Sequence, residues 1–208
     1  MNNLRFNKNL FLLLPYITII IGLYVFRNIW IAMVSYHISI LFIAIFTKNL
    51  SKFKMLIKGW SLSLTILFTL GCAVNGVLIY YLWPFISSCG DLGLKLATLG
   101  LNDSNWLLLI LYYSIITPWL EEFFWRDLLA SKSKFPDLSD VLFAGYHLFV
   151  LALFIKAFFL PVVFITLLSA AWVWRFVSRK SDGLLIPVIS HTAADVSTIL
   201  AVYLLVQI

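Results

Sequence analysis

The chain has 208 residues, of which 62% are hydrophobic and 12% charged, and its formal net charge is +6. A soluble domain is about half apolar and about a quarter charged, so this composition excludes an ordinary soluble enzyme and is typical of a polytopic membrane protein. The basic residues lie in short connecting segments and form no stripe with interleaved aromatics, so the lipid bilayer is an expected partner and nucleic acid is not.

Seven apolar segments predict an all-α, polytopic transmembrane helical bundle of about seven spans, because a bilayer core about 30 Å thick needs about 20 apolar helical residues. In chain order they are Leu10–Phe26, Asn28–Phe46, Ser61–Trp83, Trp106–Ala130, Asp140–Ile155, Ala157–Ser178 and Leu184–Ile208. The first segment lacks a small-residue cleavage site and is interpreted as a retained span. The first two meet at Arg27-Asn28, which leaves open whether they form a hairpin.

No polar block is long enough to form a separate soluble core. We therefore expect residues 1–208 to form a single membrane domain. Residues 1–105 would hold the N-terminal spans and an outer loop, and residues 106–208 the spans that carry the chemistry. The outer stretch PFISSCGDLGLKLATLGLNDSN predicts either a short helix on the membrane surface or a plain loop. Cys72 and Cys89 are expected to be packing thiols rather than a disulfide.

The linkers predict the orientation of the bundle, because Lys and Arg are in excess in cytoplasmic loops. With the N-terminus in the cytoplasm and the C-terminus outside, twelve basic residues are cytoplasmic and three are outside. The cytoplasmic ones are Arg5, Lys8, Lys48, Lys52, Lys54, Lys58, Arg126, Lys132, Lys134, Arg175, Arg179 and Lys180, and the outer ones are Arg27, Lys95 and Lys156. The sequence thus predicts a multi-pass integral protein of a bacterial inner or plasma membrane.

Several polar side chains lie inside these spans. They are Glu121, Glu122 and Arg126 in the fourth span, His147 in the fifth, and His191 and Asp195 in the seventh. A charge at the bilayer centre costs at least about 2.5–3.5 kcal/mol, so such residues usually face a protein interior or a wet cavity and mark function. His37 in the second span has no acidic partner and is expected to be structural.

Three of these side chains have similar predicted depths. At a rise of 1.5 Å per helical residue, Glu121, His147 and His191 lie about 15, 10 and 13 Å from the cytoplasmic ends of their helices. Scattered structural residues would not converge in this way, so we expect the three to share one polar pocket.

Spacing within the helices predicts specific pairs. Glu122 and Arg126 are four residues apart, so they share a helix face and can form an ion pair, which leaves Glu121 to point elsewhere. His191 and Asp195 have the same spacing. Each pair also has a purely structural interpretation. The first could be an ion pair near a helix end, and the second a hydrogen-bonded pair that locks the last helix.

Phe143 and His147 repeat the spacing, so the aromatic ring could pack beneath the imidazole. His147 alone could also be a core histidine with satisfied hydrogen bonds. Phe143 is therefore a candidate support for the site, together with the Glu122–Arg126 pair.

These residue types indicate hydrolysis of an acyl bond by water. Glu121 in a low-dielectric site is suited to act as a general base on water, and His147 to hold that water and shuttle its proton. His191 in its N–H form could donate to a developing oxyanion. Glu121, His147 and His191 could alternatively bind zinc. The chain has no H-E-x-x-H spacing, and we favour a mechanism with no cofactor.

The segments EEFFWRDLL, FAGYH and GLLIPVISHTAAD resemble the E-E-x-x-x-R, F-x-x-x-H and H-x-x-x-N/D motifs of the CPBP intramembrane proteases. This family includes CAAX prenyl endopeptidases, bacteriocin-processing enzymes and Abi-like proteins. The resemblance covers residues 117–199 and implies a glutamic-type intramembrane endopeptidase that acts on a membrane-embedded or lipidated peptide or protein. It implies a water-activating Glu121 with His147 as partner, an oxyanion-stabilising pair of His191 and Asp195, and a brace of Glu122 and Arg126.

Two positions depart from the family pattern. Asp127 stands where glycine is frequent, and Asp195 where the prenyl endopeptidases tend to have asparagine. An ionised aspartate cannot donate a hydrogen bond. Asp195 would therefore be protonated, orient His191 or bind a positive group. A non-catalytic immunity or scaffold protein and a proton-coupled transporter are the alternative functions.

Overall fold

The computed structural model describes residues 11–129 and 131–207, which form helices joined by short connections. Five helical segments are long and apolar enough to cross a membrane, and two further apolar helices are shorter. The predicted all-α fold is therefore confirmed, and each of the seven predicted segments contains a helix. The ends Leu10, Ala130 and Ile208, and the basic residues Arg5 and Lys8, lie outside the described residues.

The helices have the following bounds in chain order. The α-helices are α2 (Leu14–Ile19), α3 (Ile29–Phe46), α4 (Leu62–Ile86), α5 (Leu92–Ala97), α6 (Trp106–Glu122), α7 (Leu138–Leu151), α8 (Leu160–Lys180) and α9 (Leu185–Val206). Two π-helical segments, η1 (Ile20–Val25) and η4 (Phe123–Leu128), continue α2 and α6, and the 3₁₀ segments are η2 (Leu50–Ile57), η3 (Asp103–Asn105) and η5 (Ala157–Phe159).

The first two predicted spans form a hairpin. Arg27 takes a positive φ of 49°, and the side chain of Asn28 accepts hydrogen bonds from the backbone N–H groups of Trp30 and Ile31, which caps α3. The two helices cross closely at Gly22, where an added Cβ would lie 2.4 Å from the Cα of Ala32. The turn is therefore a capped helix start, and the crossing requires glycine.

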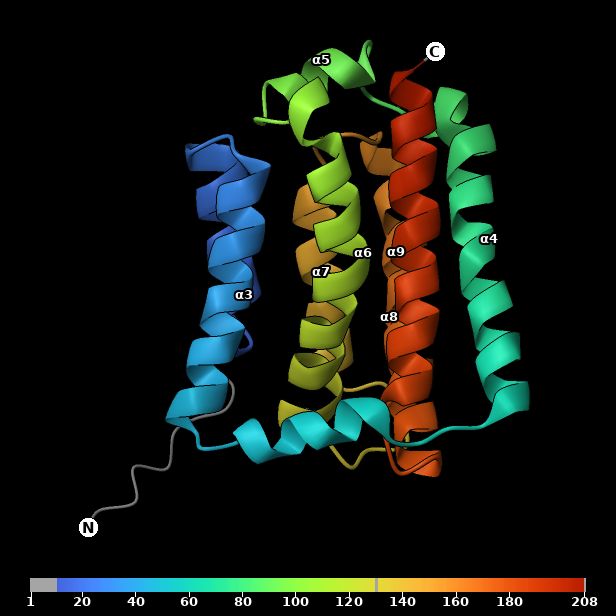
Figure 1. The fold of residues 1–208 in the computed structure, drawn as a ribbon. Coiled ribbons are helices and arrows are strands. Elements are labelled where there is room, and N and C mark those ends of the chain that lie inside the picture. The colour runs from blue at the N-terminus through green and yellow to red at the C-terminus, as the bar shows by residue number, and fades with distance from the viewer. Residues whose placement is uncertain (1–10, 130, 208) are drawn as a thin grey trace.

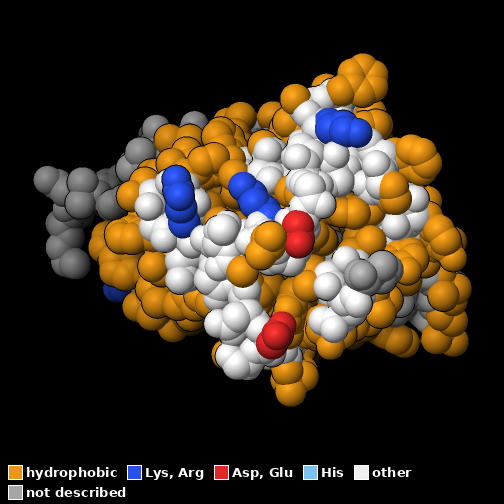
Figure 2. Space-filling model, turned by 90° about the horizontal axis from the view of Figure 1, so that it is seen from above, with side chains coloured by type: hydrophobic (Ala, Val, Ile, Leu, Met, Phe, Trp, Pro, Cys, Tyr) orange, Lys and Arg blue, Asp and Glu red, His pale blue; other side chains and the backbone are white. Residues whose placement is uncertain are grey.

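The helices run between two ends of the molecule, with α3 and α4 at opposite flanks and α6 to α9 between them (Figure 1). The segment η2 lies at one end, and α5 and the last turns of α9 lie at the other. Figure 2 looks onto the end that carries α5, where scattered charged side chains lie among many hydrophobic ones. The predicted cytoplasmic linker Lys48–Lys58 thus lies at the end opposite the predicted outer stretch.

The outer stretch contains a short helix and not only a loop. Leu92 and Leu96 of α5 are buried against Trp106 and Ile199 at the outer ends of α6 and α9. This apolar cluster fixes α5 to the bundle. The two cysteines are free, as expected, and Cys89 lies in the connection that precedes α5.

A small-residue contact joins α4 to α9. Gly76 lies so close to α9 that an added Cβ would be 2.1 Å from the carbonyl oxygen of Ser197. Beside it, the Asn75 amide donates to the Thr198 hydroxyl at 2.7 Å, and the Gly76 N–H donates to the Ser197 hydroxyl at 3.2 Å. Close approach and interhelical hydrogen bonds are the usual means by which helices associate in membranes.

We expect Gly76→Ala to lower the free energy of unfolding by about 1–3 kcal/mol, because the new methyl group would push α4 away from α9. Unfolding in detergent micelles measures this change. Gly71→Ala is the matched control, since no atom beyond the adjoining helix backbone lies within 4 Å of its Cβ position. Equal stabilities of the two variants would contradict the close contact.

Candidate active site

The two glutamates lie where α6 passes into the π-helix η4. Glu121 and Glu122 end α6, and Arg126 lies within η4. Single-turn π segments within α-helices are frequent at functional sites. The side chains are inside the protein, with 2% of Glu121, none of Glu122 and 4% of Arg126 exposed.

Glu122 is held from two sides. Its Oε2 lies 3.5 Å from Nε of Arg126, which is the ion pair that the i,i+4 spacing predicts. Its Oε1 lies 2.8 Å from Nδ1 of His191, and because an ionised carboxylate only accepts, Nδ1–H of His191 is the donor. Glu122 therefore connects the fourth predicted span to the seventh.

Arg126 is held mainly by charge and by aromatic rings. Its guanidinium carbon lies 4.4 Å from the ring centre of Phe143 and 5.7 Å from that of Trp174. The Phe143 ring also meets the His147 ring edge-on, with centroids 4.6 Å apart. Phe143 thus contacts His147, as the spacing predicts, and also Arg126, which the spacing does not predict.

His191 lies between several carboxyl groups. Its Nε2 is 3.8 Å from Oε2 of Glu121 and 3.6 Å from Oδ1 of Asp195. Trp174 of α8 stacks on the imidazole with ring centroids 4.5 Å apart and an interplanar angle of 22°. The ring is therefore fixed in direction, with Nδ1 towards Glu122 and Nε2 towards Glu121 and Asp195.

His147 joins the cluster through a tyrosine. The hydroxyl of Tyr146 hydrogen-bonds to Oε1 of Glu121 and lies 3.1 Å from Nε2 of His147. Nδ1 of His147 donates to the backbone carbonyl of Phe143 at 2.8 Å. Both ring nitrogens are thus engaged by protein atoms, whereas the sequence suggested that His147 holds a water directly.

All the candidate residues meet in one group built by α6, η4, α7 and α9, in which His147 is half-buried and the others are buried. The sequence did not reveal Tyr146 or Trp174, because an aromatic residue in an apolar span carries no distinct signal. For Tyr146, its position directly before His147 is the one clue. His37 lies apart from this group and bonds to the hydroxyl of Tyr112 at 2.8 Å, as a structural histidine would.

A second buried ion pair fixes the connection between α6 and α7. Arg175 of α8 donates from Nε and from Nη2 to the carboxylate of Asp140, the latter at 2.6 Å, and neither residue is exposed. Arg175 also donates to the carbonyl oxygens of Ser133 at 2.7 Å and Phe135 at 2.8 Å. This pairing positions the start of α7 against α8.

Asp137 completes this connection as the N-cap of α7. Its carboxylate accepts from the backbone N–H groups of Ser139 and Asp140. Burial raises its pKa, but the hydroxyls of Ser131 and Ser139 and the charge of Arg175 outweigh burial, so the pKa is lowered. Because of this cap, α7, the helix of the fifth predicted span, begins at Leu138, two residues before the predicted start at Asp140.

The arrangement does not fit a zinc ion. Of the expected ligands, His147 has both nitrogens engaged, and His191 has only Nε2 free of a hydrogen bond. Within the described residues, no group of three or more His, Cys, Asp or Glu side chains is placed to hold a metal. We therefore derive no step through a metal.

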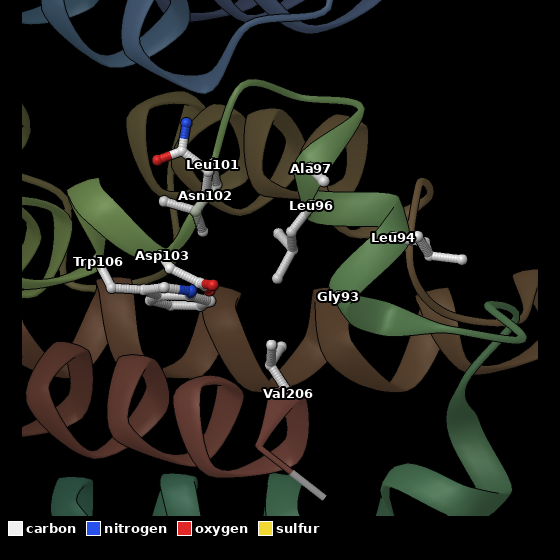
Figure 3. Close-up of a pocket in the computed structure, with 9 residues that line it drawn as sticks. All are labelled: Gly93, Leu94, Leu96, Ala97, Leu101, Asn102, Asp103, Trp106 and Val206. Atoms are coloured by element: carbon white, nitrogen blue, oxygen red, sulfur yellow. The ribbon is translucent and has the colours of Figure 1, made fainter.

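The hollow at the outer end is separate from this polar group. A cavity of about 280 Å³ opens between α5 and the ends of α6 and α9 (Figure 3). Its lining residues are Gly93, Leu94, Leu96, Ala97, Leu101, Asn102, Asp103, Trp106 and Val206. None of the candidate site residues is among them.

A family model described as "Type II CAAX prenyl endopeptidase Rce1-like" matches residues 103–197, which include all three motifs. No curated protein and no solved structure matches the chain. The family match supports a multi-pass membrane enzyme of the CAAX-protease type, with peptides as substrates. The match begins near the expected boundary at residue 105, and the division of the domain stays a prediction. Residues 103–197 are similar to the Rce1-like family model, and over this part of the chain the resemblance to the CPBP intramembrane proteases is confirmed.

Proposed function

We propose that the protein is a glutamic-type intramembrane endopeptidase that hydrolyses a peptide bond of a membrane-embedded or lipid-anchored protein. The observation that carries the proposal is the cluster in which the buried Glu121, His191 and Asp195 and the half-buried His147 come together from three separate helices. Buried ionisable groups in a membrane bundle are costly and mark function. The Rce1-like match over the same residues independently supports peptide hydrolysis.

Glu121 is the proposed general base. It takes a proton from water while the water oxygen bonds to the carbonyl carbon of the substrate and the carbonyl oxygen becomes an oxyanion. The C–N bond then breaks, and the proton passes from Glu121 to the leaving amine. This route leaves a new carboxyl group and a free amine, and Glu121 returns to its ionised form.

His191 is the proposed donor to the oxyanion. Because Nδ1–H is directed at Glu122, the donor to the substrate is Nε2–H, which requires the imidazolium form. Glu122 and Asp195 lie beside the ring and favour that form through their negative charge. Of the three roles considered for Asp195, binding a positive group therefore has the best support, because Oδ1 lies 3.6 Å from Nε2 of the proposed imidazolium, beyond hydrogen-bond distance.

The Rce1-like match makes a lipidated C-terminus the first substrate class to examine. The proposed location is the plasma membrane of a bacterium. The test compares membrane proteomes of cells that express the wild type or Glu121→Gln, with uncut C-termini as the readout. Proteins that keep their C-terminal segment only with the variant would support the endopeptidase. Identical C-termini in both cell lines would contradict it.

We expect a chelator to leave the cleavage rate unchanged, because the proposed route uses no metal. The rate is measured in proteoliposomes before and after dialysis against EDTA, with a zinc-dependent peptidase treated in parallel. Loss of activity that zinc restores would replace this mechanism with the zinc alternative.

A further inference from the structure

Tyr146 occupies the space between the two residues that the family motifs pair. Its hydroxyl hydrogen-bonds to Oε1 of Glu121 and lies within 3.1 Å of Nε2 of His147. The tyrosine is 4% exposed, and its ring stacks on Trp125 with centroids 5.9 Å apart and an interplanar angle of 7°. The hydroxyl is therefore held in place by packing.

Hydrogen-bond donors and acceptors restrict the protonation of this group. A tyrosine hydroxyl has one proton and donates to only one neighbour. If it donates to an ionised Glu121, then Nε2 of His147 must carry the proton that completes the second bond. If it donates to a neutral Nε2, then Glu121 must be protonated. In both forms Nδ1–H stays with the carbonyl of Phe143.

The same contacts distinguish the two oxygens of Glu121. Oε1 is engaged by Tyr146, whereas Oε2 has no hydrogen-bond partner among the described residues and faces Nε2 of His191 at 3.8 Å. A buried acceptor without a partner is an unusual feature of a folded protein. Oε2 is thus the oxygen available to a water molecule beside the proposed oxyanion donor.

We propose that Tyr146 is a positioning residue that joins Glu121 and His147 into one unit with a shared proton and leaves Oε2 of Glu121 to accept the proton of the attacking water. This inference rests on the proposed function for its chemistry. The hydrogen-bonded link between Glu121 and His147 through Tyr146 does not depend on the proposed function. Neither the motifs nor the family match assigns a role to Tyr146.

The test uses ¹⁵N-histidine NMR of the full chain in detergent micelles, and it needs no substrate. The chain has three histidines, so His147 is assigned by substituting the other two singly. We expect Glu121→Gln to change the Nε2 chemical shift of His147, and we expect this change to vanish when Tyr146→Phe is also present. The phenyl ring keeps the stacking on Trp125, so the added Tyr146→Phe change removes the hydroxyl and not the aromatic packing.

Tyr16→Phe is the matched control. The Tyr16 hydroxyl donates to the carbonyl of Leu142 at 2.9 Å, so this change also removes one tyrosine hydrogen bond to α7. We expect the effect of Glu121→Gln on His147 to persist in that background. An effect of the same size with and without the Tyr146 hydroxyl would overturn the inference.

The two proposals fail in different ways. If cells with Glu121→Gln show full proteolysis in the proteome comparison, the proposed function fails. The NMR result still decides whether the Tyr146 hydroxyl links Glu121 to His147. If Glu121→Gln abolishes proteolysis but still changes the Nε2 chemical shift of His147 in the Tyr146→Phe background, only the role of Tyr146 is wrong.

Discussion

Glu121→Gln is expected to lower kcat by about 10³-fold, within the range typical for loss of a general base, and to leave KM unchanged. The amide has nearly the same size as the carboxylate and still accepts the Tyr146 hydrogen bond, but it cannot take up a proton from water. The measurement is cleavage of a peptide recovered from the proteome comparison, in proteoliposomes, together with the unfolding midpoint of each variant.

Asp127→Asn is the matched control for this substitution. Asp127 lies in η4, directly after α6, but its carboxylate lies 4.0 Å from the half-exposed Lys52, and its side chain is 23% exposed. A partly exposed pair at this distance contributes about 0–1 kcal/mol, and the Asn side chain keeps the size and one oxygen acceptor of Asp, so the variant should be stable and active. Wild-type cleavage by a well-folded Glu121→Gln protein would exclude Glu121 as the base.

Arg175→Ala is expected to lower the free energy of unfolding by about 3–5 kcal/mol, because it leaves the buried carboxylate of Asp140 without its partner. The carbonyl oxygens of Ser133 and Phe135 lose their donors as well. The start of α7 would shift and carry His147 away from Glu121, so proteolysis should also fall. Unfolding in detergent micelles and the cleavage assay measure the two effects.

Arg179→Ala provides a comparison on the same helix. Nη1 of Arg179 donates to the carbonyl of Ser133 at 2.7 Å, but the residue is exposed. A hydrogen bond of this kind contributes about 0.5–1.5 kcal/mol, so a small loss is expected. If Arg175→Ala and Arg179→Ala lose equally little stability, the buried pair does not hold α7.

The sequence was sufficient for the parts of the site that depend on spacing along one helix. The four-residue separation of Glu122 and Arg126, and that of His191 and Asp195, correctly predicted that each pair meets. The common depth of Glu121 and His191 also agrees with their contact across two helices. The catalytic roles of these residues stay predictions.

The specific contacts between helices could not be predicted from the sequence. They depend on how each helix is rotated about its axis and shifted along its neighbour, and the apolar residues of the spans do not indicate either. Tyr146 is an example, because its role as a bridge depends on how far α7 is turned towards α6. Asp140 is another. Its charge suggested a helix end at the membrane surface, whereas Arg175 of a different helix buries it completely.

The near-complete enclosure of Glu121, of which 2% is exposed, has a consequence for selectivity. A substrate polypeptide could reach this carboxylate only if the neighbouring helices moved apart. A substrate in the bilayer beside these helices would then enter between them more readily than a protein in the cytosol. For the proposed endopeptidase, this enclosure would exclude soluble proteins as substrates and would make location in the membrane the first requirement of a substrate.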